Sequence, residues 1–345
     1  MYKSYQTIFP NLTDVAATLI TAKFVLNRFT LIESSKLPVM SRLQTFDISY
    51  NLLTAVSLQL VLSRSPVIKT LTFTTNPLNV IQTSDLVGSN SLVTLDLAKC
   101  ELSSIPRFPN MPALQILYLY LNDFTTFISD TFQSVPNLML LYVRQNYNFA
   151  LFPDLSYLTN LKVIGAEKTS ITEFDIANFR LLHTATLTST LIRVFPNISH
   201  SNLQKLFLDE NHLTEVPLGK VSNLAKMMRF YLVNNKLTKF PFEMIDSAPR
   251  MILLSLANNQ FQTIPDLTWY ATPRTNPLEI DFTENPFICD QRLAWLVNFA
   301  SPNLKILLSE KPCASPLEFI NRTWVSITAA ELPEYIYGMK SITIF

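Results

Sequence analysis

A short pattern of leucines and one asparagine recurs along most of this 345-residue chain and constrains its fold more than any other feature. The clearest copies read LxxLxLxxNxL, as at Leu114, Leu117, Leu119, Asn122 and Phe124. Eleven copies align, and a weaker twelfth runs from residue 19 to residue 29. The polar position falls at residues 27, 51, 76, 100, 122, 146, 169, 190, 211, 235, 259 and 285, in steps of 21 to 26. A period of this length indicates an array of stacked structural units.

Elementary physics accounts for the letters of the motif. Leucines that alternate with other residues predict a short strand whose leucines point inward and whose other residues point outward. The strands are expected to stack as a parallel sheet. The chain then turns, and an asparagine amide can bond the backbone groups that the turn leaves unpaired. Cys100, Thr169 and Thr190 replace this asparagine in three copies, where we expect part of the same set of hydrogen bonds.

The motif resembles the leucine-rich-repeat family over residues 19–287. This resemblance implies an α/β solenoid, a horseshoe with a parallel sheet on its concave face and an irregular convex side. Proline recurs after the polar position, as at Ile105-Pro106, and favours an extended chain there. Proteins of this family present a surface that binds another macromolecule. We therefore expect a binding protein and no enzyme.

Residues 285–334 resemble the cysteine-bearing C-terminal cap of extracellular leucine-rich-repeat proteins, and residues 335–345 follow as a tail. A cap is needed because a solenoid exposes its core at each end. Asp290 is predicted to begin a small cap helix, with Trp295 packed beside it. The residues expected to share the buried face of this helix are Leu293, Leu296, Val297 and Ala300.

The cap of that family usually holds four cysteines, paired first with third and second with fourth. This chain keeps only Cys289 and Cys313, with Gln291 at the place of the second cysteine and no cysteine near Glu334, where the fourth would fall. The resemblance thus implies a disulfide between Cys289 and Cys313. The alternative is a pair of unpaired buried thiols in an intracellular protein. Cys100, in the polar column, is interpreted as structural.

The resemblance also implies a cysteine-rich N-terminal cap, which this sequence lacks. Residues 1–18 either improvise a cap, or the chain begins inside a longer product. The sequence leaves both possibilities open.

Charge and composition argue against several functions. The chain has 27 basic and 26 acidic residues, a net charge of +1, so we expect no nucleic-acid partner. No apolar run reaches the length of a transmembrane segment. The 4 glycines are too scattered for phosphate-binding loops, and the 3 histidines show no catalytic or metal-binding spacing. No catalytic residue, cofactor or metal site is therefore predicted.

Outward strand positions predict where a protein partner would bind. Two groups stand out: Tyr118, Tyr120, Tyr142 and Arg144, and then Phe207, Arg229 and Tyr231. Gly165, Thr186 and Thr188 lie between them, so the two groups would flank a shallow saddle roughly 20 Å across at the usual strand spacing. Tyrosine and arginine often carry binding energy at interfaces. The alternative is that these aromatics only pack on one another across the sheet.

Three Asn-x-Ser/Thr sequons, at Asn11, Asn197 and Asn321, lie outside the predicted strands and are glycosylation candidates. Together with the cap, they favour an extracellular or cell-surface protein of the adhesion or recognition type. The alternatives are an intracellular scaffold and a non-catalytic subunit of an enzyme complex. The ligand and the oligomeric state do not follow from the sequence.

Overall fold

The computed structural model describes residues 5–88, 90–177, 179–199, 202–271 and 273–335. The chain divides into two compact units, Met1–Ile192 and Arg193–Phe345. We call them the N-terminal and C-terminal units and describe each by itself.

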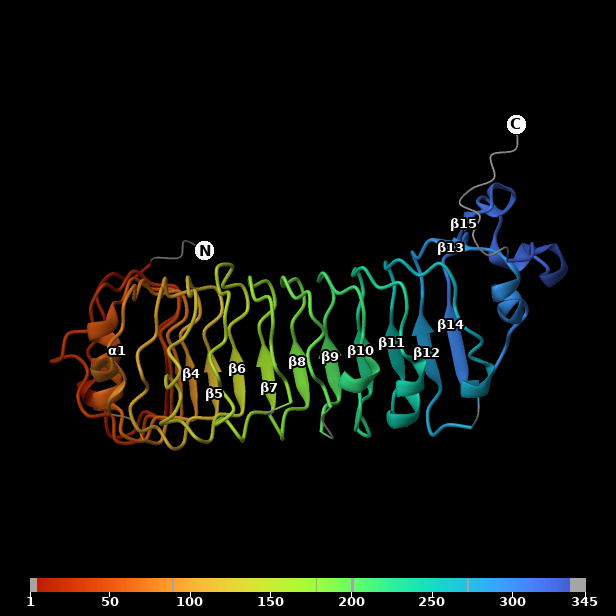
Figure 1. The fold of residues 1–345 in the computed structure, drawn as a ribbon. Helices are drawn as coiled ribbons and strands as arrows, with labels where there is room; N and C mark the ends of the chain where they lie inside the picture. Colours follow the sequence, from red (N-terminus) through yellow and green to blue (C-terminus); the bar gives the residue numbers. More distant parts are fainter. Residues whose placement is uncertain (1–4, 89, 178, 200–201, 272, 336–345) are drawn as a thin grey trace. The chain divides into compact units, whose positions relative to one another are not determined.

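The N-terminal unit contains eight three-residue strands in its described part, stacked in the order of the sequence (Figure 1). Neighbouring strands are parallel and in register, so that Phe46 pairs with Leu71 and Leu71 with Leu95. The strands are β1 (Thr21–Lys23), β2 (Thr45–Asp47), β3 (Thr70–Thr72), β4 (Thr94–Asp96), β5 (Ile116–Tyr118), β6 (Leu140–Tyr142), β7 (Val163–Gly165) and β8 (Thr184–Thr186). Each falls on one predicted copy of the motif.

The C-terminal unit continues the same pattern with β9 (Lys205–Phe207), β10 (Arg229–Tyr231), β11 (Leu253–Ser255) and β12 (Leu278–Asp281). One more strand, β14 (Leu304–Leu307), pairs with β12 inside the region predicted as the cap. This strand was not predicted, although the exposed Lys305 separates Leu304 from Ile306. A separate small parallel pair joins β13 (Phe287–Ile288) and β15 (Cys313–Ser315).

The inward side chains of the repeats form the core. In β5, Leu117 is fully buried, whereas its neighbours Ile116 and Tyr118 are partly exposed. The same buried centre recurs in every three-residue strand of the stack, as the alternation of the motif predicted. Outward residues of the strands are therefore available on one face of the sheet, which we call the open face.

The asparagine column ties each repeat to the one before it. In Asn122, Oδ1 accepts hydrogen bonds from the backbone N–H groups of Cys100 (2.9 Å) and Leu102 (3.1 Å). Its Nδ2 donates to the carbonyls of Leu97 (2.9 Å) in the preceding repeat and Leu119 (3.0 Å) in its own. Comparable bridges are made by Asn51, Asn76, Asn146, Asn235, Asn259 and Asn285.

The three substitutes in this column make part of that set, as predicted. The Thr169 hydroxyl donates to the Ala166 carbonyl (2.8 Å), and the Thr190 hydroxyl donates to the Leu187 carbonyl (3.2 Å). Cys100 Sγ lies 3.5 Å from the Phe73 carbonyl and 3.4 Å from that of Ala98. Burial raises the pKa of the Cys100 thiol to about 12, so it stays protonated and unreactive.

A backbone feature that the motif did not reveal accompanies the column. The residue before each polar position has a left-handed conformation, for example Gln145 with φ 59° and Thr75 with φ 58°. Such a φ is unfavourable for residues with a Cβ, and most of all for β-branched ones. The twelve positions are Leu26, Tyr50, Thr75, Lys99, Leu121, Gln145, Lys168, Ser189, Glu210, Asn234, Asn258 and Glu284.

The return segments between strands are mostly irregular, as expected, and a few of them carry short helices. One carries the α-helix α1 (Ala55–Arg64), whose buried residues Ser57, Leu58, Val61 and Leu62 recur with helical spacing. Others carry 3₁₀ turns, namely η2 (Thr83–Leu86), η3 (Leu218–Lys220), η4 (Phe242–Ser247) and η5 (Thr268–Ala271).

Residues 5–18 pack against the first repeats and include the short turn η1 (Thr13–Val15). Phe9 is buried, and its ring centroid lies 5.2 Å from that of Phe24, 5.5 Å from that of Phe29 and 6.5 Å from that of Phe46. Leu12 is also buried. These side chains lie against the core where the first strand would otherwise leave it open.

The C-terminal cap begins as predicted and then departs from the prediction. The Asp290 carboxylate accepts a hydrogen bond from the Arg292 backbone N–H (3.0 Å) at the start of η6 (Gln291–Leu296). Leu293 and Leu296 are buried. The helix is a 3₁₀ helix that ends at Leu296, so the predicted extension of its buried face was wrong: Val297 is only partly buried and Ala300 is exposed. The cap continues with η7 (Leu317–Phe319), η8 (Trp324–Ser326) and η9 (Ala329–Glu331).

Candidate functional site

Four side chains predicted to bind a partner lie together on the open face of the N-terminal unit. We call Tyr118, Tyr120, Tyr142 and Arg144 the tyrosine surface. Tyr118 and Tyr142 end the neighbouring strands β5 and β6 and are paired in register. Their rings stack with centroids 5.5 Å apart and planes 4° apart. The Tyr120 ring is nearly perpendicular to that of Tyr118, at 84°, with centroids 6.2 Å apart.

Arg144 completes this surface. Its guanidinium carbon lies 4.8 Å from the centroid of the Tyr120 ring and 5.7 Å from that of Tyr142. Cation–π attraction therefore holds the guanidinium against the rings. The side chain nevertheless remains exposed, so its hydrogen-bond donors face solvent.

A glycine determines where the Tyr142 ring can lie. A Cβ at Gly165 on β7 would lie 2.3 Å from Cδ1 and 2.7 Å from Cε1 of Tyr142. The ring therefore occupies the space above Gly165 that a side chain would take. The sequence showed a small residue at this position, but it did not predict that the Tyr142 ring packs over it.

Charges differ on the two sides of the tyrosine surface. Asp96 on β4 pairs in register with Tyr118, and burial raises the pKa of its carboxyl. Burial, and then the Asp96 carboxylate, raise the pKa of Tyr120. Burial, and then Tyr118, raise the pKa of Tyr142. Both phenols are thus neutral at physiological pH and can donate hydrogen bonds, with a carboxylate on one side and a guanidinium on the other.

The tyrosines do pack on one another across the sheet, which was the alternative interpretation of this group. Tyr118, Tyr120 and Tyr142 are each only partly buried, however, and remain partly accessible to solvent. Packing therefore holds the rings in place without covering them.

The second predicted group lies in the C-terminal unit. The rings of Phe207 on β9 and Tyr231 on β10 stack with centroids 4.7 Å apart and planes 8° apart. Arg229 lies two residues before Tyr231 and pairs in register with Lys205. The two groups belong to different units, so the saddle between them stays a prediction.

Asp209 lies beside this second group, two residues after Phe207. Its carboxylate accepts a hydrogen bond from the Val233 backbone N–H (2.8 Å). Burial raises its pKa to about 6, more than that hydrogen bond lowers it. The sequence alone favours a solvated carboxylate at Asp209 with no acid-base role, whereas its hydrogen bond comes from the neighbouring repeat.

The disulfide implied by the family resemblance is present. Cys289 and Cys313 are bonded, with their Cα atoms 5.5 Å apart. This bridge confirms the predicted pairing and joins the β13 and β15 strands of the cap.

Hydrogen bonds of Gln291 take the place of the second bridge of the family. Its side-chain Nε2 donates to the carbonyls of Ala329 (3.0 Å) and Leu332, and its backbone N–H donates to the Pro333 carbonyl (2.9 Å). The two segments that the missing cysteines would link are thus held together by one amide side chain and its backbone.

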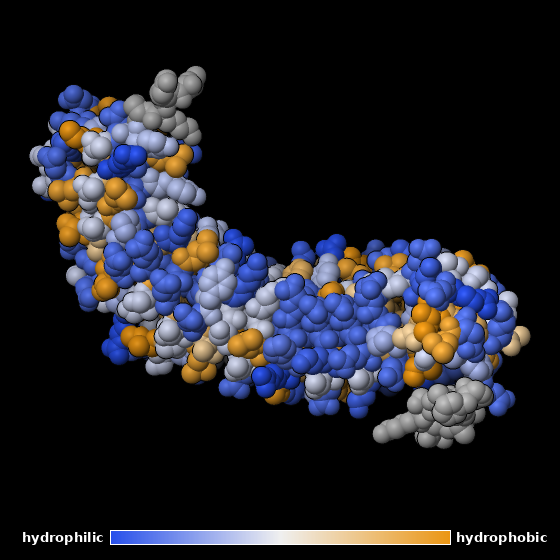
Figure 2. All heavy atoms as spheres, turned by 90° about the horizontal axis from the view of Figure 1, so that it is seen from above, coloured by the Kyte–Doolittle hydropathy of each residue, from blue (hydrophilic) through white to orange (hydrophobic). Residues whose placement is uncertain are grey.

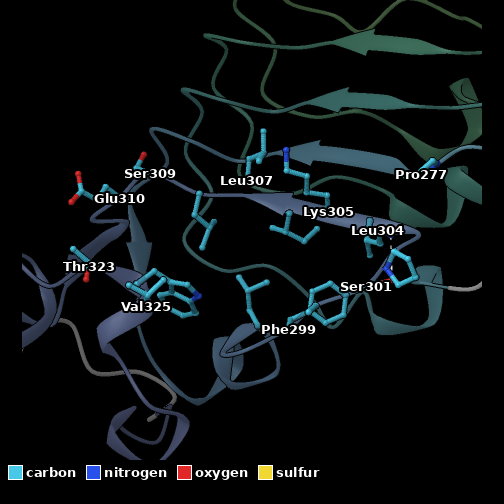
Figure 3. Close-up of a pocket in the computed structure, with 16 residues that line it drawn as sticks. Pro277, Phe299, Ser301, Leu304, Lys305, Leu307, Ser309, Glu310, Thr323 and Val325 are labelled. Carbon is cyan, nitrogen blue, oxygen red and sulfur yellow. Dashed lines mark hydrogen bonds between the residues drawn. The ribbon is translucent and has the colours of Figure 1, made fainter.

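A hollow of about 690 Å³ lies between β14 and the cap (Figure 3). Its walls include Leu296, Phe299, Leu304, Ile306 and Trp324. Figure 2 shows hydrophobic residues on the surface of the same end of the chain, at the right of the view. The most exposed of the cap are Val325 (93%) and Leu317 (86%).

The three sequon asparagines, Asn11, Asn197 and Asn321, are exposed and lie outside the strands. Asn11 already accepts hydrogen bonds from the backbone N–H (3.0 Å) and hydroxyl (2.6 Å) of Thr13. Their glycosylation stays a prediction.

The described residues contain no group of three or more histidine, cysteine, aspartate or glutamate residues able to hold a metal ion. No helix within the same residues is long and apolar enough to cross a membrane.

Comparison with solved structures identifies the fold. The chain is similar to an internalin from Listeria monocytogenes, with a TM-score of 0.65 and 15% identity over 90% of this chain and 87% of that one. It is also similar to a chain of the Toll–Spatzle complex from Drosophila, with a TM-score of 0.70 and 17% identity over 94% of this chain and 50% of that one.

A third similar structure is a chain of the TLR13–ssRNA13 complex, with a TM-score of 0.55 and 20% identity over 85% of this chain and 51% of that one. No protein-family model matches the sequence, and no curated protein matches it significantly. At these identities the similarity shows a common fold. The chain has the leucine-rich-repeat solenoid fold.

Proposed function

We propose that the chain binds a protein partner through the tyrosine surface. The single observation that carries this proposal is the ordered cluster of three partly exposed tyrosines and one exposed arginine on the open face. Tyrosine and arginine are enriched among the residues that dominate interface energies. Because the stacked rings are already in place, these tyrosines would lose little side-chain entropy when a partner binds.

The similar structures support a binding role as a class. One of them is a complex with Spatzle and another a complex with single-stranded RNA. A protein partner is favoured for this chain because its net charge of +1 gives no field that would attract an RNA backbone. Asp96 beside the rings would also repel phosphate groups.

We further propose that the chain works outside the cell or at its surface. The Cys289–Cys313 bridge supports this, since disulfides persist in oxidising compartments. The alternative is an intracellular scaffold. A thiol count on denatured, unreduced protein separates the two: one free thiol, from Cys100, supports an extracellular protein, and three support the intracellular alternative.

No catalytic role is part of this proposal. The tyrosine surface contains no nucleophile paired with a base, and the Cys100 thiol is buried and protonated. A non-catalytic subunit that binds an enzyme would use the same surface and is the remaining alternative.

The test compares two baits in a pull-down with mass-spectrometric identification, followed by affinity measurement on the purified partner. The wild-type chain and the Tyr118→Ala/Tyr142→Ala variant are used side by side. A partner that needs the tyrosine surface should bind the double variant about 10-fold or more weakly, because such residues each cost 1 kcal/mol or more when truncated.

Tyr147→Ala is the matched control. Tyr147 is 60% exposed but lies after the asparagine column, outside the tyrosine surface. It should leave the affinity unchanged. A partner that binds both variants equally, or a single-stranded RNA that competes for the same surface, contradicts the proposal.

A further inference from the structure

Trp269 lies in the 3₁₀ turn η5 of the C-terminal unit, and 72% of its surface is accessible. Trp269 lines two hollows, one of about 620 Å³ and one of about 330 Å³. Tryptophan is rarely left this exposed without a role, because burying its large apolar surface is favourable. The surroundings of the indole therefore indicate what would cover it.

The larger hollow, which we call the Trp269 hollow, combines aromatic and acidic walls. The rings of Trp269 and Tyr270 meet at 62° with centroids 6.5 Å apart. Glu243 and Asp246, from the turn η4, line the same hollow and are exposed. Two aromatic and two acidic side chains thus line one space.

The carboxylates act electrostatically on the aromatic pair. Burial, then the Asp246 carboxylate and then that of Glu243 raise the pKa of Tyr270. This order means that both carboxylates lie close enough to the phenol for their charges to be felt there. A cation in the hollow would be attracted by these charges, and the exposed indole offers it an aromatic surface.

Arg274, the one cation lining the Trp269 hollow, does not occupy this space. Its Nη2 donates to the carbonyls of Ala248 (3.2 Å) and Pro249 (3.3 Å), so its guanidinium is bound to backbone. Two carboxylates against one guanidinium leave a net charge of −1 on the lining side chains. Asp266, which lines the second hollow, adds a carboxylate on another side of the indole.

We propose that the Trp269 hollow binds a lysine or arginine side chain of a partner protein. Tryptophan is the best aromatic platform for a cation, and the two carboxylates favour the same charge. The hollow is open rather than enclosing, so it cannot bury most of a free small molecule, as small-ligand pockets do. An exposed tryptophan with a charged surround is instead typical of a protein interface.

This site is separate from the tyrosine surface. It lies on return segments and belongs to the other unit, whereas the tyrosine surface lies on strands. The two proposals can therefore fail independently.

The experiment follows the indole N–H signals of ¹⁵N-labelled full-length protein by NMR during titration. The chain has 3 tryptophans, which give three such signals, and the Trp269→Phe variant assigns the one of interest. The probes are Nα-acetyl-lysine methylamide and Nα-acetyl-arginine methylamide, with the uncharged Nα-acetyl-norleucine methylamide as control. We expect both cations to shift the Trp269 signal saturably and the norleucine compound to leave it unmoved.

Carboxylate variants test the charge. Glu243→Gln/Asp246→Asn should weaken binding of both cations about 3-fold to 10-fold, as expected for exposed charge pairs. Glu173→Gln/Asp175→Asn, which removes two exposed carboxylates from the N-terminal unit, is the matched control and should have no effect. All four side chains are exposed, so neither double variant threatens the fold.

Three outcomes overturn the proposal. The first is an unmoved Trp269 signal with both cations, and the second is equal binding by the carboxylate variant. The third is tighter binding of tetramethylammonium than of either amino-acid derivative, which would point to a free quaternary ammonium ligand rather than a protein side chain.

Discussion

The two ends of the chain cover the hydrophobic core by different physical means. Near the N-terminus, Phe9 inserts its ring among the phenylalanines of the first repeats, without a covalent bond. The C-terminal cap relies on the Cys289–Cys313 bridge and on the hydrogen bonds of Gln291. Burial is insensitive to reductants and acid, whereas cross-links depend on solution conditions. The covering of the core should therefore depend little on reductants and acid at the N-terminal end and more strongly on them at the C-terminal end.

The largest expected effect tests the N-terminal end. Phe9→Ala should destabilise the protein by about 3 to 5 kcal/mol, because the ring is buried and its loss leaves a cavity. Chemical denaturation measures this loss. Ile8→Ala is the control, since Ile8 is 68% exposed, and should change stability by less than about 0.5 kcal/mol. Equal effects of the two variants would mean that Phe9 does not cover the core.

The next effect concerns the disulfide at the other end. Cys289→Ser/Cys313→Ser should cost about 2 to 4 kcal/mol, since the bridge closes a loop with a sequence separation of 24. Dithiothreitol should lower the melting temperature of the wild-type protein and leave that of the double variant unchanged. If reductant lowers both alike, the bridge is not what stabilises the cap.

A smaller effect is expected where a hydrogen-bonding amide replaces the second bridge. Gln291→Ala should cost about 1 kcal/mol, because the side-chain bonds to the carbonyls of Ala329 and Leu332 are lost. Thermal melts would measure it. Gln260→Ala removes an exposed amide elsewhere in the unit and should be neutral. A neutral Gln291→Ala would leave the disulfide as the main cross-link of the cap.

The smallest effect is a pH dependence confined to the C-terminal end. Arg322, and then Thr328, lower the pKa of Glu331 to about 2. A lowered carboxyl pKa adds stability that is fully present above about pH 4.5 and is lost as the pH falls toward 2. Glu331→Gln should therefore reduce the drop in melting temperature over that range. Glu318→Gln, nearby and exposed, should not. A difference in melting temperature between the wild type and Glu331→Gln that stays the same down to about pH 2 would contradict this assignment.

Much of the fold could be predicted because it depends on local periodicity. The alternating leucines placed twelve strands, and the asparagine column placed the turns. The helix α1 was missed because its apolar residues were assigned to a convex segment, although Leu58, Val61 and Leu62 have helical spacing. The strand β14 was missed because it lies between Cys289 and Cys313, in a region assigned to the cap and not to a repeat.

The candidate site was predictable in membership but not in geometry. The two-residue period put Tyr118, Tyr120, Tyr142 and Arg144 on one face, and register brought them together. Ring stacking and the position of Arg144 depend on side-chain rotamers, which depend in turn on neighbours from other repeats. Trp269 escaped notice because no periodicity applies to return segments, and only its exposure reveals it.

Gly165 constrains the tyrosine surface without being one of its four residues. Any larger residue there would displace the ring of Tyr142, and with it the stacked Tyr118. The shape offered to a partner can thus be changed by one substitution on the neighbouring strand while all four residues of the surface stay the same. Variation at this one position would change the shape of the proposed binding surface while keeping the residues proposed to make contact.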